Sequence, residues 1–177
     1  FAQDTREMDA HVHGVSAAEI AIEHGKVVIN ILSPGMDIVG FEYAATSAED
    51  KDAVEAAIRT MLSPENIVTL PAAAGCRLTK VLAHLDAGDH DDEEHAEGEG
   101  HDHDHSHDRD DHTDEAQHSA FHVSYAFACE DDNTLTTISF PFFNQFENAQ
   151  EIEVQYVTET AVGQAEITRD AADLTLE

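Results

Sequence analysis

Alternating apolar and polar residues near the N-terminus predict a β-hairpin. Residues 17–23 place Ile20 and Ile22 on one face, and residues 26–32 continue as a largely apolar strand. The His-Gly dipeptide at residues 24–25 suits a tight turn, because glycine readily adopts the positive φ that two-residue hairpin loops need. We therefore expect two antiparallel strands at the start of the fold.

A helical pattern follows the hairpin. Thr46 or Ser47 can cap a helix, and Glu49 lies three residues after Thr46, which is the spacing of a capping box. Apolar residues then recur with a period near 3.6, at Val54, Ala57, Ile58, Met61 and Leu62. The pattern predicts an amphipathic helix of about 15 residues that ends at Ser63-Pro64.

The later apolar runs predict further strands. They lie at residues 76–85, 121–129, 135–143, 150–158 and 164–176. We expect an α+β fold, with an antiparallel sheet covered by one main helix. A chain of 177 residues that is 41% hydrophobic has the size of one domain, so we take residues 1–177 as a single domain.

One segment differs in composition from all the others. Residues 89–115 hold fourteen acidic residues, seven histidines and one base, Arg109, and they contain no Val, Ile, Leu, Phe, Tyr or Trp. Such a segment has no apolar surface to bury against the entropy of ordering, so it is expected to be disordered without a ligand. We expect this acidic, His-rich insert to interrupt the domain at about residues 87–118.

The net charge narrows the range of partners. The chain carries 38 acidic and 8 basic residues, a formal net charge of −30, and removing residues 89–115 still leaves a net charge of −17. Such a surface repels nucleic acid and anionic membranes and attracts cations. No apolar run approaches the ~18 residues that span a bilayer, so we expect no membrane insertion. We also expect a monomer.

The two cysteines, Cys76 and Cys129, lie on the predicted strands that flank the insert. An even number of cysteines in an exported chain favours a disulfide, although two buried free thiols remain the alternative. We expect the disulfide to tie the two strands together across the base of the insert. A disulfide that closes a loop of about fifty residues would add about 4 kcal/mol to the free energy of unfolding in the chain-entropy model.

The insert has the composition of a metal-binding segment. Imidazole occurs at every second residue, at His101, His103, His105 and His107, with acidic residues or serine between them. In an extended chain these side chains share one face, so two or three of them can close on one ion. Imidazole with carboxylate favours zinc, or copper or nickel, over calcium or magnesium.

Four further histidines are candidates for metal ligands. His11 and His13 are two residues apart in a segment expected to be extended, so their side chains would point the same way. His118 and His122 lie on the polar face of the strand that follows the insert. We choose His11, His13 and His122 as the nitrogen ligands of a tight zinc site, and we assign His118 to the insert as a further ligand.

Signatures of covalent chemistry are absent from the sequence. It contains no HExxH, GxSxG, P-loop or GxGxxG motif, and the cysteines do not form a CxxC pair. We therefore expect a protein that is not an enzyme. A zinc-dependent hydrolase, with three histidines and an open coordination position, is the remaining enzymatic alternative.

Several motifs resemble the ZrgA-type periplasmic zinc-binding proteins of Gram-negative bacteria. They are HVHG at residues 11–14, Ser33-Pro34 leading to VGFE at residues 39–42, Ala-Gly-Cys at residues 74–76 before the His-rich insert, and the phenylalanines Phe143 and Phe146. The family often has histidine after GFE, where this chain has Tyr43. The resemblance implies a periplasmic protein that works with a zinc-uptake transporter, and it favours His11 and His13 as ligands.

These observations lead to one expected function. The chain would capture zinc in a folded site and in the flexible insert, and pass it to components of an uptake system. A periplasmic buffer or resistance protein for zinc, copper or nickel is the alternative that the sequence does not separate from it.

Overall fold

The computed structural model describes residues 13–87 and 118–176. These residues form a six-stranded sheet in the order β3-β4-β2-β1-β6-β7, and a two-stranded sheet in the order β5-β8. The strands are β1 (Val15–Glu23), β2 (Lys26–Pro34), β3 (Cys76–Ala87), β4 (Ser119–Cys129), β5 (Thr137–Ser139), β6 (Glu151–Val157), β7 (Val162–Thr168) and β8 (Asp173–Thr175). The helices are α1 (Gly35–Ile38), α2 (Ala48–Met61) and α3 (Phe142–Gln145), with 3₁₀ turns at Pro64–Asn66, Ala72–Ala74 and Asp132–Thr134.

The predicted hairpin is confirmed. Strands β1 and β2 pair from Glu23↔Lys26 to Ala17↔Leu32, and the turn between them has positive φ at both His24 and Gly25. Positive φ at both central residues is what a type I′ turn requires, and this turn follows the twist of the strands.

The predicted helix is also confirmed as α2, and the structure decides between the two predicted caps. The side chain of Ser47 accepts a hydrogen bond from the backbone N–H of Asp50, so Ser47 rather than Thr46 is the N-cap. Only Ala57 and Met61 of α2 are buried. The helix therefore covers only part of the sheet.

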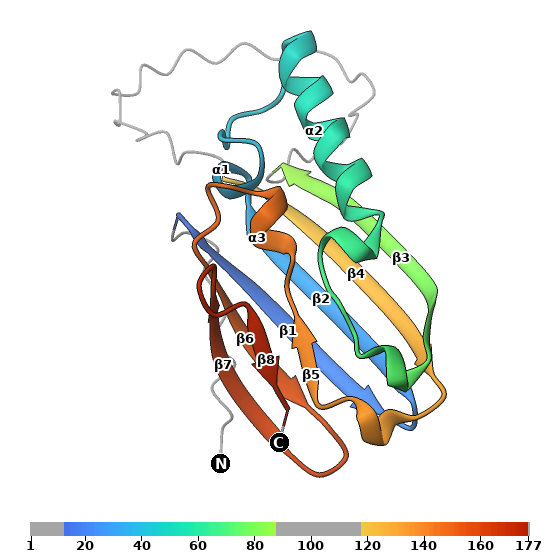
Figure 1. Ribbon diagram of the computed structural model, residues 1–177. Coiled ribbons are helices and arrows are strands. Elements are labelled where there is room, and N and C mark those ends of the chain that lie inside the picture. Colours follow the sequence, from blue (N-terminus) through green and yellow to red (C-terminus); the bar gives the residue numbers. More distant parts are fainter. Residues whose placement is uncertain (1–12, 88–117, 177) are drawn as a thin grey trace, which may run out of the picture.

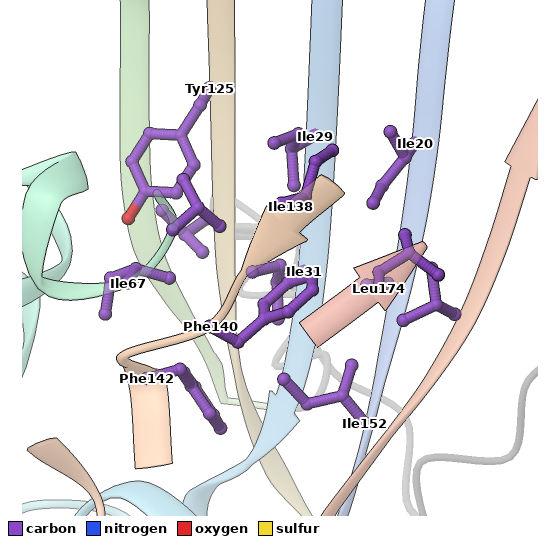
Figure 2. Close-up of a cluster of buried hydrophobic side chains, with 14 of the residues drawn as sticks. Ile20, Ile29, Ile31, Ile67, Tyr125, Ile138, Phe140, Phe142, Ile152 and Leu174 are labelled. Carbon is purple, nitrogen blue, oxygen red and sulfur yellow. The ribbon is translucent and has the colours of Figure 1, made fainter. Parts of the chain in front are cut away.

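Short segments that follow the helix cover the rest of this face of the large sheet. In Figure 1, α2, α3 and the β5–β8 ladder lie on the same side of the large sheet. Figure 2 shows side chains from this layer facing those of the sheet, with Ile67, Ile138, Phe140 and Leu174 against the isoleucines and Tyr125. The expected α+β architecture of a sheet and one main helix is thus correct, and a second layer of irregular chain is added to it.

Two predicted strands are wrong over part of their length. The segment 135–143 is a strand only at β5, and its phenylalanines continue into α3, where Phe142 and Phe143 are buried. The segment 164–176 is divided into β7 and β8 by a turn at residues 169–170. The sheet is also not purely antiparallel, because β1 and β6 pair in parallel.

The disulfide between Cys76 and Cys129 is present, but its place differs from the expectation. The two cysteines are directly paired on β3 and β4, with their Cα atoms 3.9 Å apart. At the other end of the same two strands Ala87 pairs with Ser119, and the insert joins the strands there. The disulfide therefore closes the strand pair at the end far from the insert.

The opposite face of the large sheet carries polar and small side chains on β4, and exposed apolar ones such as Val28 and Leu82 on the neighbouring strands. On β4, the core-facing Phe121, Val123 and Tyr125 alternate with His122 and Ser124, which are half-buried on this second face. No helix in residues 13–87 or 118–176 is long and apolar enough to cross a membrane.

Candidate metal centre

Three segments that are far apart in the sequence bring His13, Glu42 and His118 together. His13 lies in the turn before β1, Glu42 lies in the loop after α1, and His118 directly precedes β4. The Nε2 atom of His13 is 3.4 Å from Oε1 of Glu42, and Nδ1 of His118 is 2.5 Å from Oε2 of the same carboxylate. The start of β1, α1 and the start of β4 lie at one end of the sheet in Figure 1.

Backbone hydrogen bonds fix the position of His13. The N–H of Gly14 donates to Oδ1 of Asp37 at 2.7 Å, and the carbonyl oxygen of Gly14 accepts from the N–H groups of Gln150 and Glu151, each at 2.9 Å. Gly14 has a φ of +87°, a conformation that is strained for side-chain-bearing residues. The turn that presents His13 is therefore held from both α1 and β6.

A close approach of α1 to β4 positions Glu42. Gly35, at the start of α1, is buried, and a Cβ atom there would lie 2.5 Å from Oγ of Ser119 and 2.7 Å from the carbonyl oxygen of Phe41. Glycine thus allows the chain on either side of it to pack directly against the residues next to Glu42 and His118.

The pKa values of the two carboxylates in this region, Glu42 and Asp37, are shifted in opposite directions. Burial of Glu42, whose side chain is 11% exposed, raises its pKa, but the hydrogen bonds from His118 and His13 outweigh burial and hold the pKa below its ordinary value. Burial raises the pKa of Asp37, and this is only partly offset by the hydrogen bond from Gly14 and the nearby His13. Oδ2 of Asp37 is buried without a hydrogen-bond partner among the described residues.

The donor set suits zinc. Two imidazole nitrogens and one carboxylate oxygen are ordinary zinc ligands, and bonds of 2.0–2.1 Å in a tetrahedron place neighbouring ligand atoms about 3.4 Å apart. The three ligand atoms here all lie within 4.8 Å of one another. Small side-chain movements are therefore enough to close them on one ion, with a fourth position left for water or another ligand.

A second group of the same composition lies on the polar face of the sheet. It consists of His84 and Asp86 on β3 and His122 on β4, and its ligand atoms also lie within 4.8 Å of one another. Among the described residues no other group of three such ligands occurs.

The structure thus separates two of the ligands that the sequence placed in one site. His13 lies with His118, whereas His122 lies with His84. The third ligand chosen for that site, His11, is outside the described residues, and so are His101, His103, His105 and His107. The expected extended segment before β1 is a turn at His13 and Gly14, because Gly14 there adopts positive φ.

Glu42, Asp86 and His84 were not selected from the sequence. Glu42 stood in the VGFE motif used for the resemblance, which was a usable signal, whereas a carboxylate such as Asp86 is not distinctive in so acidic a chain. The His84↔His122 pairing depends on the strand register. Tyr43 takes the position next to Glu42, stacks on Phe41 and donates its hydroxyl hydrogen to Asp50 at 3.3 Å.

Comparison with known proteins gives one clear result. A family model described as "ZrgA family zinc uptake protein" matches residues 10–176, which is nearly the whole chain. The match includes every residue of both groups described above. A search of curated proteins finds no match.

Proposed function

Since the chain belongs to the ZrgA family of zinc uptake proteins, we propose that it captures zinc in the periplasm and passes it to the components of an uptake transporter. The observation that carries this proposal is the convergence of His13, Glu42 and His118, from three separate segments, on one point at the surface. We propose these three side chains as the ligands of the tight folded site. His11 is a candidate for the fourth position, on the strength of its place in the HVHG motif.

Pre-organisation supports a tight site at this position. Gly14, Asp37 and Gly35 hold the backbone that carries the ligands, and Glu42 already accepts hydrogen bonds from both imidazoles. A site of this kind does not have to order its backbone when the ion binds, so more of the interaction energy goes into affinity. The histidines of the insert, such as His101 and His103, would collect further zinc more weakly, since a segment of this composition is expected to be ordered only when a ligand binds.

Zinc titration of the full-length protein against a chromophoric chelator tests the folded site. We expect the double variant His13→Ala/His118→Ala to lose the tightest zinc ion, with at least about a hundredfold weaker binding at that site, because two of its nitrogen ligands are gone. The matched control is His24→Asn, which removes an exposed imidazole from the β1–β2 turn, where φ is +49° and asparagine is tolerated. Unchanged affinity of the tightest ion in the double variant would contradict the ligand assignment.

A cellular experiment separates uptake from storage. In cells that lack this protein, the unaltered gene should restore growth when zinc is scarce, and the double variant should not. If the protein were a buffer or resistance protein, its loss would instead lower the tolerance to excess zinc and leave growth in scarce zinc unchanged. The second result would replace the uptake proposal with storage.

A further inference from the structure

We infer that His84, Asp86 and His122 form a second zinc-binding site, separate from the site at His13. Only the identity of the ion rests on the proposed function. The site itself is inferred from three side chains on two paired strands, on the polar face of the large sheet.

The strand register creates this group. His84 of β3 pairs directly with His122 of β4, so their side chains leave the sheet side by side on the same face. The two imidazole rings are stacked, with centroids 5.1 Å apart and planes inclined by 5°. Asp86 lies two residues after His84 and therefore shares that face.

All three side chains point their ligand atoms at one place. Nε2 of His84 is 3.3 Å from Oδ1 of Asp86, and Nε2 of His122 is 2.8 Å from Oδ2. Tetrahedral zinc with bonds of 2.0–2.1 Å needs ligand atoms about 3.4 Å apart, so these separations are close to what an ion requires. Both histidines would bind through the same nitrogen, Nε2.

The exposure of the carboxylate distinguishes this site from the first one. The histidines of the two sites are similarly exposed, but the side chain of Asp86 is 57% exposed, whereas that of Glu42 is 11% exposed. Water competes more effectively for an exposed ion, and charge interactions are weaker there. We therefore expect the second site to bind zinc more weakly than the first and to exchange it faster.

The alternative reading is a pair of ordinary ion pairs between Asp86 and protonated imidazoles. It predicts a different response to metal at a pH where an ordinary imidazole is neutral, at about pH 8. A neutral imidazole binds zinc through its free nitrogen, whereas it has no charge with which to form the ion pair.

Nitrogen NMR spectra of the full-length, ¹⁵N-histidine-labelled protein at that pH test the inference. The resonances of His84 and His122 are assigned from the spectra of His84→Ala and His122→Ala. On addition of zinc beyond the first equivalent, we expect the Nε2 resonances of both residues to shift together. Asp86→Asn should raise the zinc concentration needed by about tenfold, because the amide lacks the charge of the carboxylate. The resonances of His24 serve as the control within the same spectra.

Two outcomes would overturn the inference. One is that the Nε2 resonances of His84 and His122 stay in place while other histidines respond to zinc. The other is that calcium, which prefers oxygen ligands, shifts them as much as zinc does. The same spectra report on His13 and His118. If only those two residues fail to respond, the proposed folded site is wrong and the second site stands.

Discussion

Glu42 contacts both imidazoles of the first site, at 3.4 Å from His13 and 2.5 Å from His118. Its pKa is held below the ordinary value, so the folded state favours its ionised form. The stability that follows from this is fully present above the ordinary pKa of glutamate, ~4.3, and is lost as the pH falls through the lower pKa of the folded state.

Replacing Glu42 with Gln should therefore change how stability depends on pH. In metal-free protein we expect Glu42→Gln to be less stable than the unaltered protein near neutral pH, and this difference should be smaller at about pH 3. Denaturant unfolding at the two pH values, with a chelator present, measures it. Glu55→Gln is the matched control, since Glu55 is an exposed acid paired with Arg59 at the surface. A stability difference that is the same at both pH values would contradict this role of Glu42.

At the scale of residues, the sequence identifies candidate metal ligands better than it identifies which of them lie together in the fold. It identified His13, His118 and His122 as candidates because histidine is rare enough on the folded strands to be noticed. It grouped His13 with His122, whereas His13 lies with Glu42 and His118. The grouping depends on the close packing of α1 against β4, which no local pattern encodes.

At the scale of elements, that close packing can be tested at Gly35. A methyl group on residue 35 would meet Ser119 and the carbonyl of Phe41, so α1 and β4 would have to separate. We expect Gly35→Ala to lower the free energy of unfolding by about 1–3 kcal/mol, which is typical of overpacking. We also expect it to weaken the tightest zinc site, because Glu42 and His118 would move apart. Thermal unfolding and zinc titration of the same variant measure the two effects.

The control for this prediction is another crowded glycine. Gly163 on β7 is covered by the ring of Tyr156, at the end of β6 far from Gly14. We expect Gly163→Ala to displace the ring of Tyr156 and destabilise the fold while zinc affinity stays unchanged. Equal losses of zinc affinity in both variants would show that Gly35 acts through general stability alone.

Most of the elements were predictable, and each exception has a physical cause. Strands with clear alternation, such as β1 and β4, and the capped helix α2 were found from period and turn residues. The segment from Leu135 to Phe143 has the composition of a strand, but Pro141 lacks the N–H of a sheet ladder and the phenylalanines fold inward into α3. The parallel pairing of β1 with β6 is a long-range choice that the hydrophobic pattern does not specify.

At the scale of the whole molecule, the insert and the folded part should be separable. Deleting residues 89–115 should lower the number of zinc ions bound and leave the tightest ion in place, because the ligands of the first site are carried by β1, β4 and α1 and their connections. Calorimetric titration of the full-length protein and the deletion variant measures both numbers. If the deletion abolishes all zinc binding, the folded site does not exist as proposed and the insert alone holds the metal.

The pairing of Ala87 with Ser119 has a consequence for how such proteins can diversify. The ends of the insert leave and enter the fold as neighbours on adjacent strands, so the separation of these two anchor points is set by the sheet and not by the number of residues between them. Lengthening a loop between fixed ends costs only about 0.6 kcal/mol for each doubling. If the insert binds zinc as proposed, changes in its length and histidine content would alter how much zinc one molecule carries, while the affinity of the proposed folded site and the stability of the sheet would stay nearly constant.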